Sequence, residues 1–203
     1  LDVSRIIQGK TELHKQEFDL ALAVQGAMEA TKTVFDERKH TLIVELSDSL
    51  PVYGDQVRLE QVLNNLLTNA ARYTSNGGTI TLTAHAEEEN AVINVKDNGI
   101  GMSPALLPRI FDLFGQGEDS LHRSSGGLGI GLTLVKKLVQ LHGGSVMAKS
   151  EGEGEGSEFI VRLPLCKTTP IVACAHAQRS DLPGLSILVA EDNKDTAVLT
   201  AEL

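Results

Sequence analysis

The side chains with the clearest chemical potential lie in the helical stretch from Asp55 to Tyr73. At about 100° per residue its apolar residues fall on one side, and the other side carries Asn65 and Asn69, one turn apart, followed by Arg72. Amide oxygens can coordinate a hard cation such as Mg²⁺, and an arginine can bind a phosphate. A face that needs only solubility usually carries Glu and Lys, so this uncharged stripe favours a ligand. Taken alone, it is also compatible with a solvated face.

A second candidate lies at residues 97–101, Asp-Asn-Gly-Ile-Gly, directly after a predicted strand. Two closely spaced glycines allow a tight turn in which a ligand can approach the backbone. The Asp97 carboxylate accepts hydrogen bonds and can bind an amino group such as that of adenine. Similar residues also form ordinary turns, so this motif alone does not settle a function.

A third candidate is the run GGLGIGL at residues 126–132, which opens a predicted helix. Its glycines expose backbone amides, and the start of a helix attracts anions. The preceding residues 115–125 are polar and include Arg123, a composition typical of a mobile lid over phosphates. The run fits neither GxxxxGK[ST] nor a GxGxxG after the first strand, so Walker and Rossmann sites are disfavoured.

These motifs need a scaffold, and the hydrophobic pattern predicts one. Helices are expected from an N-cap at Asp19 to about Lys39, from Asp55 to Tyr73, and from about Gly131 to Leu141. Strands are expected at residues 41–46, 79–85, 91–96, 145–149 and 158–163, the second and third forming a hairpin. The Glu-Gly run at residues 151–156 is interpreted as a long flexible hairpin loop. The mixed order of elements indicates an α+β fold.

Composition limits the classes of function. The chain has 203 residues, enough for one well-buried domain with additional segments, and reads as a piece of a longer protein. A net charge of −9 argues against nucleic-acid binding, so no nucleic-acid partner is expected. No apolar run approaches the ~18 residues of a membrane span, and Cys166 and Cys174 are expected to be free thiols. We therefore expect a cytoplasmic location, and the sequence leaves open whether the parent protein is membrane-anchored.

In this order, the amide helix, Asp-x-Gly-x-Gly, Phe-Asp-Leu-Phe at residues 111–114 and GGLGIGL resemble the N, G1, F and G2 boxes of histidine kinase catalytic domains. The resemblance covers residues 18–164. It implies a Bergerat-type ATP-binding fold, a two-layer α/β sandwich in which helices cover one face of a mixed sheet. It also implies that the domain binds ATP and Mg²⁺ and presents the γ-phosphoryl group for transfer to a histidine in two-component signalling.

The resemblance assigns roles to individual residues. It implies that Asn69 and Asn65 hold Mg²⁺ and that Asp97 binds the adenine amino group. Arg72 stands where the family more often has Lys, which keeps the charge but not the geometry, so its contact with phosphate stays open. The other implied nucleotide contacts are Tyr73 near the adenine or phosphates, Gly99 and Gly101 in the adenine wall, and Arg123, Gly127, Leu128, Gly129 and Gly131 on the phosphate side.

The flanking segments extend the resemblance to a hybrid kinase. Residues 1–17 resemble the tail of a dimerisation and phosphoacceptor helix, residues 18–165 the ATP-binding catalytic domain, and residues 166–184 a linker. Residues 185–203 resemble the truncated start of a receiver domain, in which Glu191 and Asp192 would be half of a Mg²⁺ site. The expected partners are the dimerisation domain of the same parent, itself expected to be a homodimer, and a response-regulator receiver.

The phosphoacceptor histidine is expected outside this chain, so no catalytic residue is assigned within it. In the family the acceptor is followed by an acidic residue and an arginine, and none of the six histidines here is. An ATPase related to gyrase, Hsp90 and mismatch-repair proteins is one alternative. It would place a Glu one turn before the metal-binding Asn, where this chain has Asn65, so the base for hydrolysis is lacking. A regulatory module without catalysis is the other alternative, but all four boxes are intact.

Overall fold

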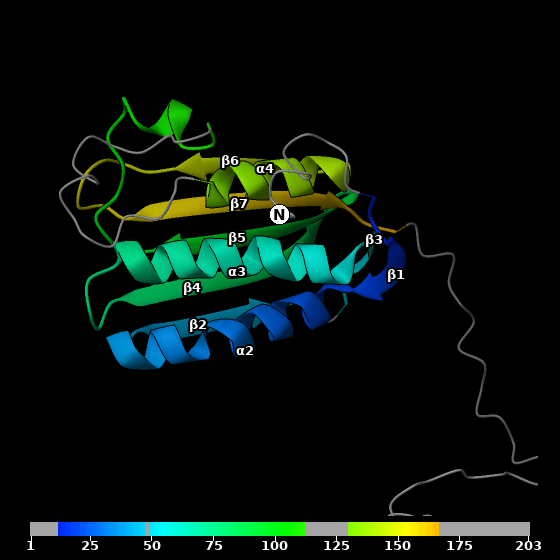
Figure 1. Ribbon diagram of the computed structural model, residues 1–203, viewed down its shortest axis with the longest axis horizontal. Helices are drawn as coiled ribbons and strands as arrows, with labels where there is room; N and C mark the ends of the chain where they lie inside the picture. Colours follow the sequence, from blue (N-terminus) through cyan, green and yellow to red (C-terminus); the bar gives the residue numbers. More distant parts are fainter. Residues whose placement is uncertain (1–11, 48, 113–129, 167–203) are drawn as a thin grey trace, which may run out of the picture. The chain divides into compact units, whose positions relative to one another are not determined.

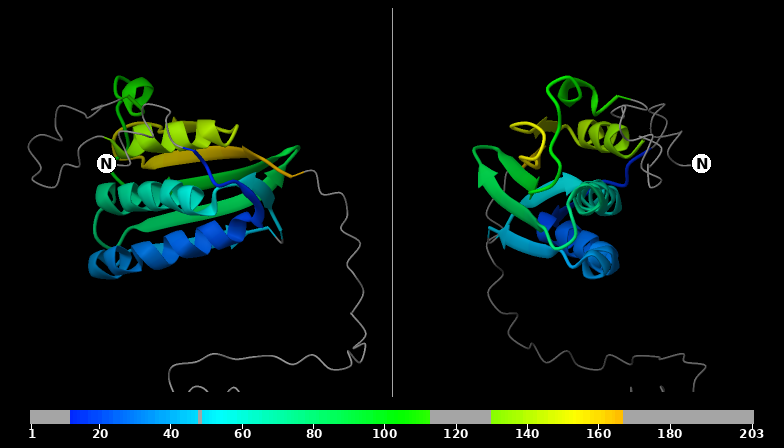
Figure 2. Two further views of the ribbon diagram at one scale, coloured as in Figure 1. Left: turned by 45° about the vertical axis from the view of Figure 1, so that its right-hand side comes forward. Right: turned by 90° about the vertical axis from the view of Figure 1, so that its left-hand side faces the viewer.

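The computed structural model describes residues 12–47, 49–112 and 130–166. In these ranges a five-stranded sheet carries three α-helices on one face, as the end-on view shows (Figure 2, right). This is the expected two-layer α+β sandwich. None of these helices has both the length and the hydropathy of a membrane span. The predicted linker, the receiver-like segment and residues 1–11 of the predicted stem lie outside the described residues.

Polar N-caps begin the two long helices. α2 (Leu20–Arg38) follows Asp19, whose carboxylate accepts the Ala21 N–H at 2.9 Å. α3 (Gln56–Tyr73) follows Asp55, whose carboxylate accepts the Arg58 N–H at 3.1 Å. α4 (Gly131–Leu141) ends before His142 and a glycine in the left-handed region. The three predicted helices are confirmed.

The sheet has the order β2-β4-β5-β7-β6 (Figure 1). Its strands are β2 (Thr41–Leu46), β4 (Thr79–Glu87), β5 (Asn90–Asp97), β6 (Ser145–Lys149) and β7 (Ser157–Pro164). β2 and β4 run parallel because α3 crosses between them, whereas β4–β5 and β6–β7 are hairpins and run antiparallel. The central pair β5–β7 is antiparallel as well. The five predicted strands are therefore present: β2 and β6 have the predicted bounds, and β4, β5 and β7 are longer by one or two residues at an end.

Two short strands were not predicted. β1 (Gln16–Asp19) pairs antiparallel with β3 (Pro51–Gly54) in a separate ribbon. Four residues are too few to show a clear alternation of apolar and polar side chains, so the sequence pattern gives no signal. Gln16 and Glu17 consequently lie in a strand, although residues 1–17 were predicted to belong to a stem helix. A single 3₁₀ turn, η1 (Leu107–Arg109), follows the Asp-x-Gly-x-Gly motif.

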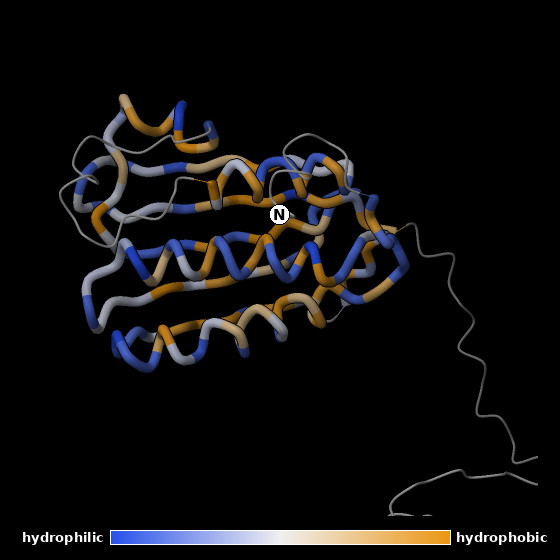
Figure 3. The backbone as a smooth tube through the Cα atoms, in the orientation of Figure 1, coloured by the Kyte–Doolittle hydropathy of each residue, from blue (hydrophilic) through white to orange (hydrophobic). Residues whose placement is uncertain are grey.

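Aliphatic side chains fill the space between helices and sheet, as the low aromatic content requires. The helices alternate hydrophobic and hydrophilic residues along their length (Figure 3). α3 contributes Leu59, Leu63, Leu66 and Leu67 to a single core cluster, each at most 2% exposed. Burying one such side chain contributes roughly 1.5–3 kcal/mol. The apolar face thereby fixes the rotation of α3, and its polar face turns away from the core.

Candidate functional site

Two of the predicted motifs and the beginning of α4 meet at one end of the domain. The C-terminal end of α3, the loop after β5 and the first turn of α4 lie together there, at the left in Figure 1. The connection is direct, because the Ile100 N–H in the loop donates to the Tyr73 carbonyl at the end of α3, at 3.0 Å. Residues far apart in the sequence are thus held at one edge of the sandwich.

Asn65 brings the amide helix against α4. Its Nδ2 donates to the Gln61 carbonyl at 2.8 Å, which fixes the side-chain amide on its own helix. Its Oδ1 lies 3.1 Å from the position that a Cβ on Gly131 would occupy. A glycine at this point of α4 therefore leaves room for the amide, and the structure brings these two predicted site residues together.

Asn69 and Arg72 continue the polar face of α3 beyond Asn65, and both are half-buried. Among the residues that the structure describes, neither side chain has a hydrogen-bond or ion-pair partner. The same part of the chain contains no group of three or more His, Cys, Asp or Glu side chains that could hold a metal ion. A divalent cation at this end of the domain would therefore rely on amide oxygens and on groups brought by a ligand.

Asp97 is a buried carboxylate, only 4% exposed. Its Oδ1 accepts the Gly99 N–H at 2.8 Å, and the Ser157 N–H also bonds the carboxylate. Burial nevertheless raises the pKa of Asp97, because the ionised form is disfavoured away from water. A carboxylate accepts up to four hydrogen bonds, so this group can still bind a donor on a ligand.

Gly99 allows the loop to lie against the end of α3. A Cβ at this position would overlap the Tyr73 carbonyl oxygen, so the close approach requires glycine. Tyr73 itself is 41% exposed beside this loop. The predicted residues Tyr73, Asp97 and Gly99 therefore form one continuous wall.

Residues 151–156, the Glu-Gly run, form part of the same wall. The Gly154 N–H donates to the Ile100 carbonyl at 2.7 Å, and the Gly156 N–H donates to the Gly99 carbonyl at 3.1 Å. Gly101 has φ of +67°, and a Cβ there would overlap the Gly152 carbonyl oxygen. The run is the predicted hairpin loop between β6 and β7, but the expectation that it is free and flexible is wrong, because its backbone is bonded to the motif. Glycine at every second position was the available signal that two backbones touch here.

Phe111 anchors the segment that follows the motif. Its ring packs edge-on against Phe159 with 6.4 Å between centroids, and the Lys136 ammonium of α4 lies 6.0 Å from its centroid. The predicted lid at residues 115–125 and residues 126–129 of the glycine-rich run lie outside the described residues, among them Arg123, Gly127, Leu128 and Gly129.

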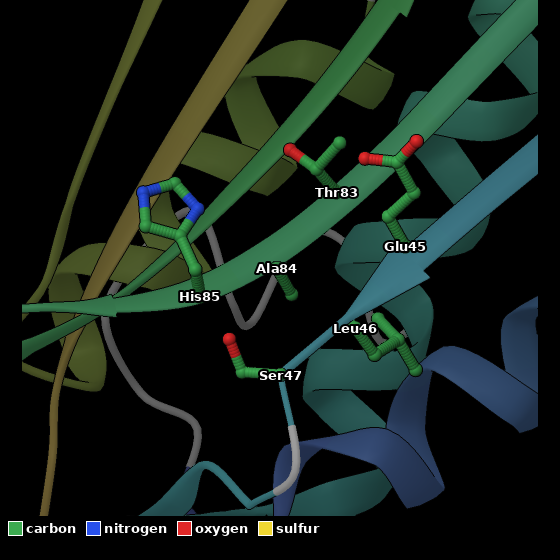
Figure 4. A pocket seen from close by; sticks show the side chains of 6 residues that line it. All are labelled: Glu45, Leu46, Ser47, Thr83, Ala84 and His85. Carbon is green, nitrogen blue, oxygen red and sulfur yellow. The ribbon is translucent and has the colours of Figure 1, made fainter.

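A separate hollow of about 280 Å³ lies at the sheet edge, away from this wall. Figure 4 shows the Glu45 and Thr83 side chains pointing the same way from neighbouring strands. The hollow is lined by Glu45, Leu46, Ser47, Thr83, Ala84 and His85. None of the predicted site residues lines it.

Residues 54–167 match the protein family described as histidine kinase-, DNA gyrase B-, and HSP90-like ATPase. The chain belongs to this family. It is 32% identical over 215 residues to the autoinducer 2 sensor kinase/phosphatase LuxQ of Vibrio parahaemolyticus, a match that covers 98% of this chain and 25% of LuxQ. Hybrid signal transduction histidine kinase D of Dictyostelium discoideum is 34% identical over an alignment of 199 residues, gaps included, a match that covers 82% of this chain and 13% of that protein.

The solved structure of full-length ShkA in complex with AMPPNP agrees with this assignment. It has a TM-score of 0.67 and 28% sequence identity, and the match covers 81% of this chain and 35% of ShkA. The fold, the family and the relatives identify the ATP-binding catalytic domain of a two-component sensor histidine kinase. The chain spans about a quarter of the length of LuxQ and 13% of the length of histidine kinase D.

Proposed function

We propose that the histidine kinase domain binds Mg-ATP in the wall formed by α3, the Asp97–Gly101 loop and the start of α4. It would present the γ-phosphoryl group to a histidine on a separate domain. The observation that carries this proposal is the buried Asp97 carboxylate beside the end of an amide-bearing helix. Burying an ionisable group with a raised pKa costs stability, and such groups are concentrated at functional sites.

Asp97 suits the adenine end of the nucleotide. The carboxylate is fixed by the Gly99 and Ser157 amides and retains acceptor capacity for an exocyclic amino group. Guanine presents a carbonyl oxygen at the position of that amino group, so the same acceptor would repel it. Gly99 and Gly101 allow the surrounding backbone to close around this point, and Ile100, 41% exposed, offers an apolar surface beside it.

The amide face of α3 suits the phosphate end. Asn69 and Asn65 would hold the ion through their side-chain oxygens, and Arg72 would bind a phosphate oxygen. Bound Mg²⁺ would supply charge neutralisation on the phosphates. Gly131 keeps the start of α4 close to Asn65, where helix-terminal amides favour an anion. Arg123, Gly127, Leu128 and Gly129 would complete this end.

The same residues favour transfer over hydrolysis. Asn65 stands where a water-activating Glu is expected in the related ATPases, and an amide cannot act as a general base. Two of the described histidines are already engaged: His142 is buried with both ring nitrogens hydrogen-bonded, and His40 bonds a backbone carbonyl. The exposed His14 and His85 are followed by Lys15 and Ala86 and so lack the acidic residue that follows the acceptor in the family. The attacking imidazole would come from the dimerisation and phosphoacceptor domain of the same parent.

The relatives and the flanking sequence support a proposal for the partners of the whole protein. A hybrid kinase would carry the dimerisation domain before this chain and a receiver domain after it, with residues 1–17, 166–184 and 185–203 in the predicted roles. Such a parent would be a homodimer that signals in the cytoplasm, with or without a membrane anchor.

Calorimetric titration of the domain with ATP tests the site. Wild type should bind ATP in Mg²⁺, and Asn69→Ala should weaken this binding about 10–100-fold, as loss of a metal ligand or its support commonly does. Asn64→Ala is the matched control, because Asn64 is an amide on the same helix that bonds Thr68. Equal affinities for wild type and Asn69→Ala would place the metal elsewhere.

Labelling with γ-³²P-ATP tests the reaction. The chain alone should acquire no acid-labile label, and a separately produced phosphoacceptor domain of the same parent should acquire it when the two are mixed. Steady release of inorganic phosphate without label on either partner would favour the ATPase alternative.

A further inference from the structure

The C-terminal end of α3 has no cap of its own. An α-helix leaves its last carbonyl groups without partners inside the helix, and a left-handed glycine commonly supplies amides for them. Here the helix ends at Thr74 in an extended conformation, with φ of −95° and ψ of 138°, and its N–H reaches only the Ala70 carbonyl. The carbonyls of Ala71, Arg72 and Tyr73 must therefore find donors elsewhere.

Two side chains supply the first donors, Arg38 from the last position of α2 and His40 from the turn that follows it. The Arg38 guanidinium donates to the Ala71 carbonyl at 3.2 Å and to the Arg72 carbonyl at 3.3 Å. The His40 Nε2 lies 2.9 Å from the same Ala71 carbonyl, and because a carbonyl only accepts, Nε2 must carry the hydrogen. Two helix C-termini lie side by side here, and the arginine charge offsets their partial negative charges.

The third carbonyl, that of Tyr73, is bonded by the Asp97–Gly101 loop. The Tyr73 carbonyl accepts the Ile100 N–H, so the last turn of α3 is held by α2 on one side and by the Asp-x-Gly-x-Gly loop on the other. The turn after α3 is held in the same way. The Gly77 N–H donates to the Arg38 carbonyl at 2.9 Å, and Thr79 N–H donates to Asn98 Oδ1 at 2.9 Å.

We propose that Arg38 and His40 are positioning residues for the nucleotide site. Their side chains bond backbone carbonyls at the end of α3, and they thereby fix the backbone from which Arg72 and Tyr73 project. Through the Tyr73 carbonyl they also fix Ile100 and the loop that carries Asp97. Loss of the Arg38 guanidinium leaves the Arg72 carbonyl without a donor. The last turn of α3 is then held less firmly, and the contact of Tyr73 with Ile100 is weakened.

Hydrogen exchange of the Ile100 amide tests this coupling without any nucleotide. Arg38→Met should speed exchange at Ile100 about tenfold, and Arg38→Lys, which keeps a donor and the charge, should restore most of the protection. The Ser47 amide, bonded to Ala84 at the far end of the sheet, should be unchanged. Lys32→Met, which removes an exposed charge from α2, is the matched control. Unchanged protection at Ile100 in Arg38→Met would overturn the proposal.

A second measurement rests on the proposed function and addresses the site directly. Wild type should prefer ATP to GTP, and Arg38→Met should lower ATP affinity about tenfold and narrow that preference, because the Asp97 wall is displaced. His40→Gln, which can still donate to the Ala71 carbonyl, should stay close to wild type. His40→Ala should have a smaller effect than Arg38→Met, because Arg38 still bonds the Ala71 carbonyl. An Arg38→Met protein with reduced thermal stability but undiminished ATP affinity and selectivity would show a purely structural contact. A wild type that bound no nucleotide would instead refute the proposed function, and the exchange result would still decide the coupling.

Discussion

The imidazole Nε2 of His142 accepts a hydrogen bond from the backbone N–H of Asp55 at 2.9 Å. Asp55 is the N-cap of α3 and His142 ends α4, so this bond joins the two helices that carry the predicted phosphate contacts, at the ends remote from those contacts. The chain that precedes β1 reaches the same joint. Its His14 N–H donates to Asp55 Oδ2 at 3.0 Å, and Lys15 Nζ donates to the Leu141 carbonyl at 2.8 Å.

This joint predicts a pH-dependent stability. Burial lowers the pKa of His142, and the positive charge of Lys15 adds to the effect, because both disfavour the imidazolium. The unfolded chain therefore binds the proton more tightly than the folded domain does. The contribution of His142 is present in full above about pH 6.5 and is lost as the pH falls through its lowered folded-state pKa.

Urea unfolding at pH 7.5 and pH 5.5 measures the effect. Wild type should lose more free energy of unfolding over this interval than His142→Asn, which has nothing to titrate at this position. His85→Asn removes an exposed imidazole and should lose as much as wild type. An identical pH dependence of the unfolding free energy in wild type and His142→Asn would show that protonation of His142 does not destabilise the domain.

Asp97→Asn is expected to change stability and nucleotide binding in opposite directions. Burial raises the pKa of Asp97, so its contribution to folding is greatest at low pH and is lost as the pH rises through the folded-state pKa. At neutral pH the ionised carboxylate is therefore a cost, and the amide, which keeps the acceptor for the Gly99 N–H, should raise the free energy of unfolding. ATP affinity should fall about tenfold, because a charge-assisted hydrogen bond becomes a neutral one.

Denaturant melts and calorimetry on the same samples check both halves of this prediction. Asp36→Asn changes an exposed carboxylate on α2 and should alter neither quantity appreciably. A variant that was both less stable and equally able to bind ATP would contradict the role given to Asp97.

Gly101→Ala should damage the wall more than an ordinary turn substitution does. A left-handed backbone costs a non-glycine residue roughly 1–2 kcal/mol, and here the new Cβ would also overlap the Gly152 carbonyl oxygen. Gly77→Ala is the matched control, because Gly77 has φ of +81° but nothing within 4 Å of its Cβ position. Unfolding free energies should therefore fall further for Gly101→Ala, and only that variant should lose nucleotide affinity. Equal losses of stability in Gly101→Ala and Gly77→Ala would mean that the Glu-Gly run moves away from the new Cβ at little cost in free energy.

Local patterns were enough to predict the main scaffold. The apolar stripe of α3 and its Asp55 cap define that helix in the sequence, and the amide stripe follows from the same periodicity. The four-residue strands β1 and β3 were missed because they are stabilised by pairing with each other, 38 residues apart at Gln16↔Gly54 and beyond the reach of local periodicity. The ordered Glu-Gly run was misread for a related reason, since its glycines are explained only by the loop at Gly99 and Gly101 that it touches.

Long-range polar contacts were also invisible to the pattern. Arg38 on α2 is separated by 33 residues from the Ala71 carbonyl that it binds, and Asp55 by 87 residues from His142. Such pairs are set by how the helices pack, and a lone Arg or His in the sequence carries no sign of its partner. The residues of the amide helix and of the Asp-x-Gly-x-Gly motif could be predicted, because their side-chain types and spacing indicate a ligand without knowledge of the tertiary contacts.

Chemical-shift mapping of the isotopically labelled domain, titrated with Mg²⁺ and a non-hydrolysable ATP analogue, locates the site residue by residue. The largest changes should cluster on the amides of Asn69, Ile100 and Gly131, with saturation at one equivalent. Shifts confined to Glu45, Thr83 and His85, around the hollow at the sheet edge, or no saturable shifts at all, would contradict a nucleotide site built from α3 and the Asp97 loop.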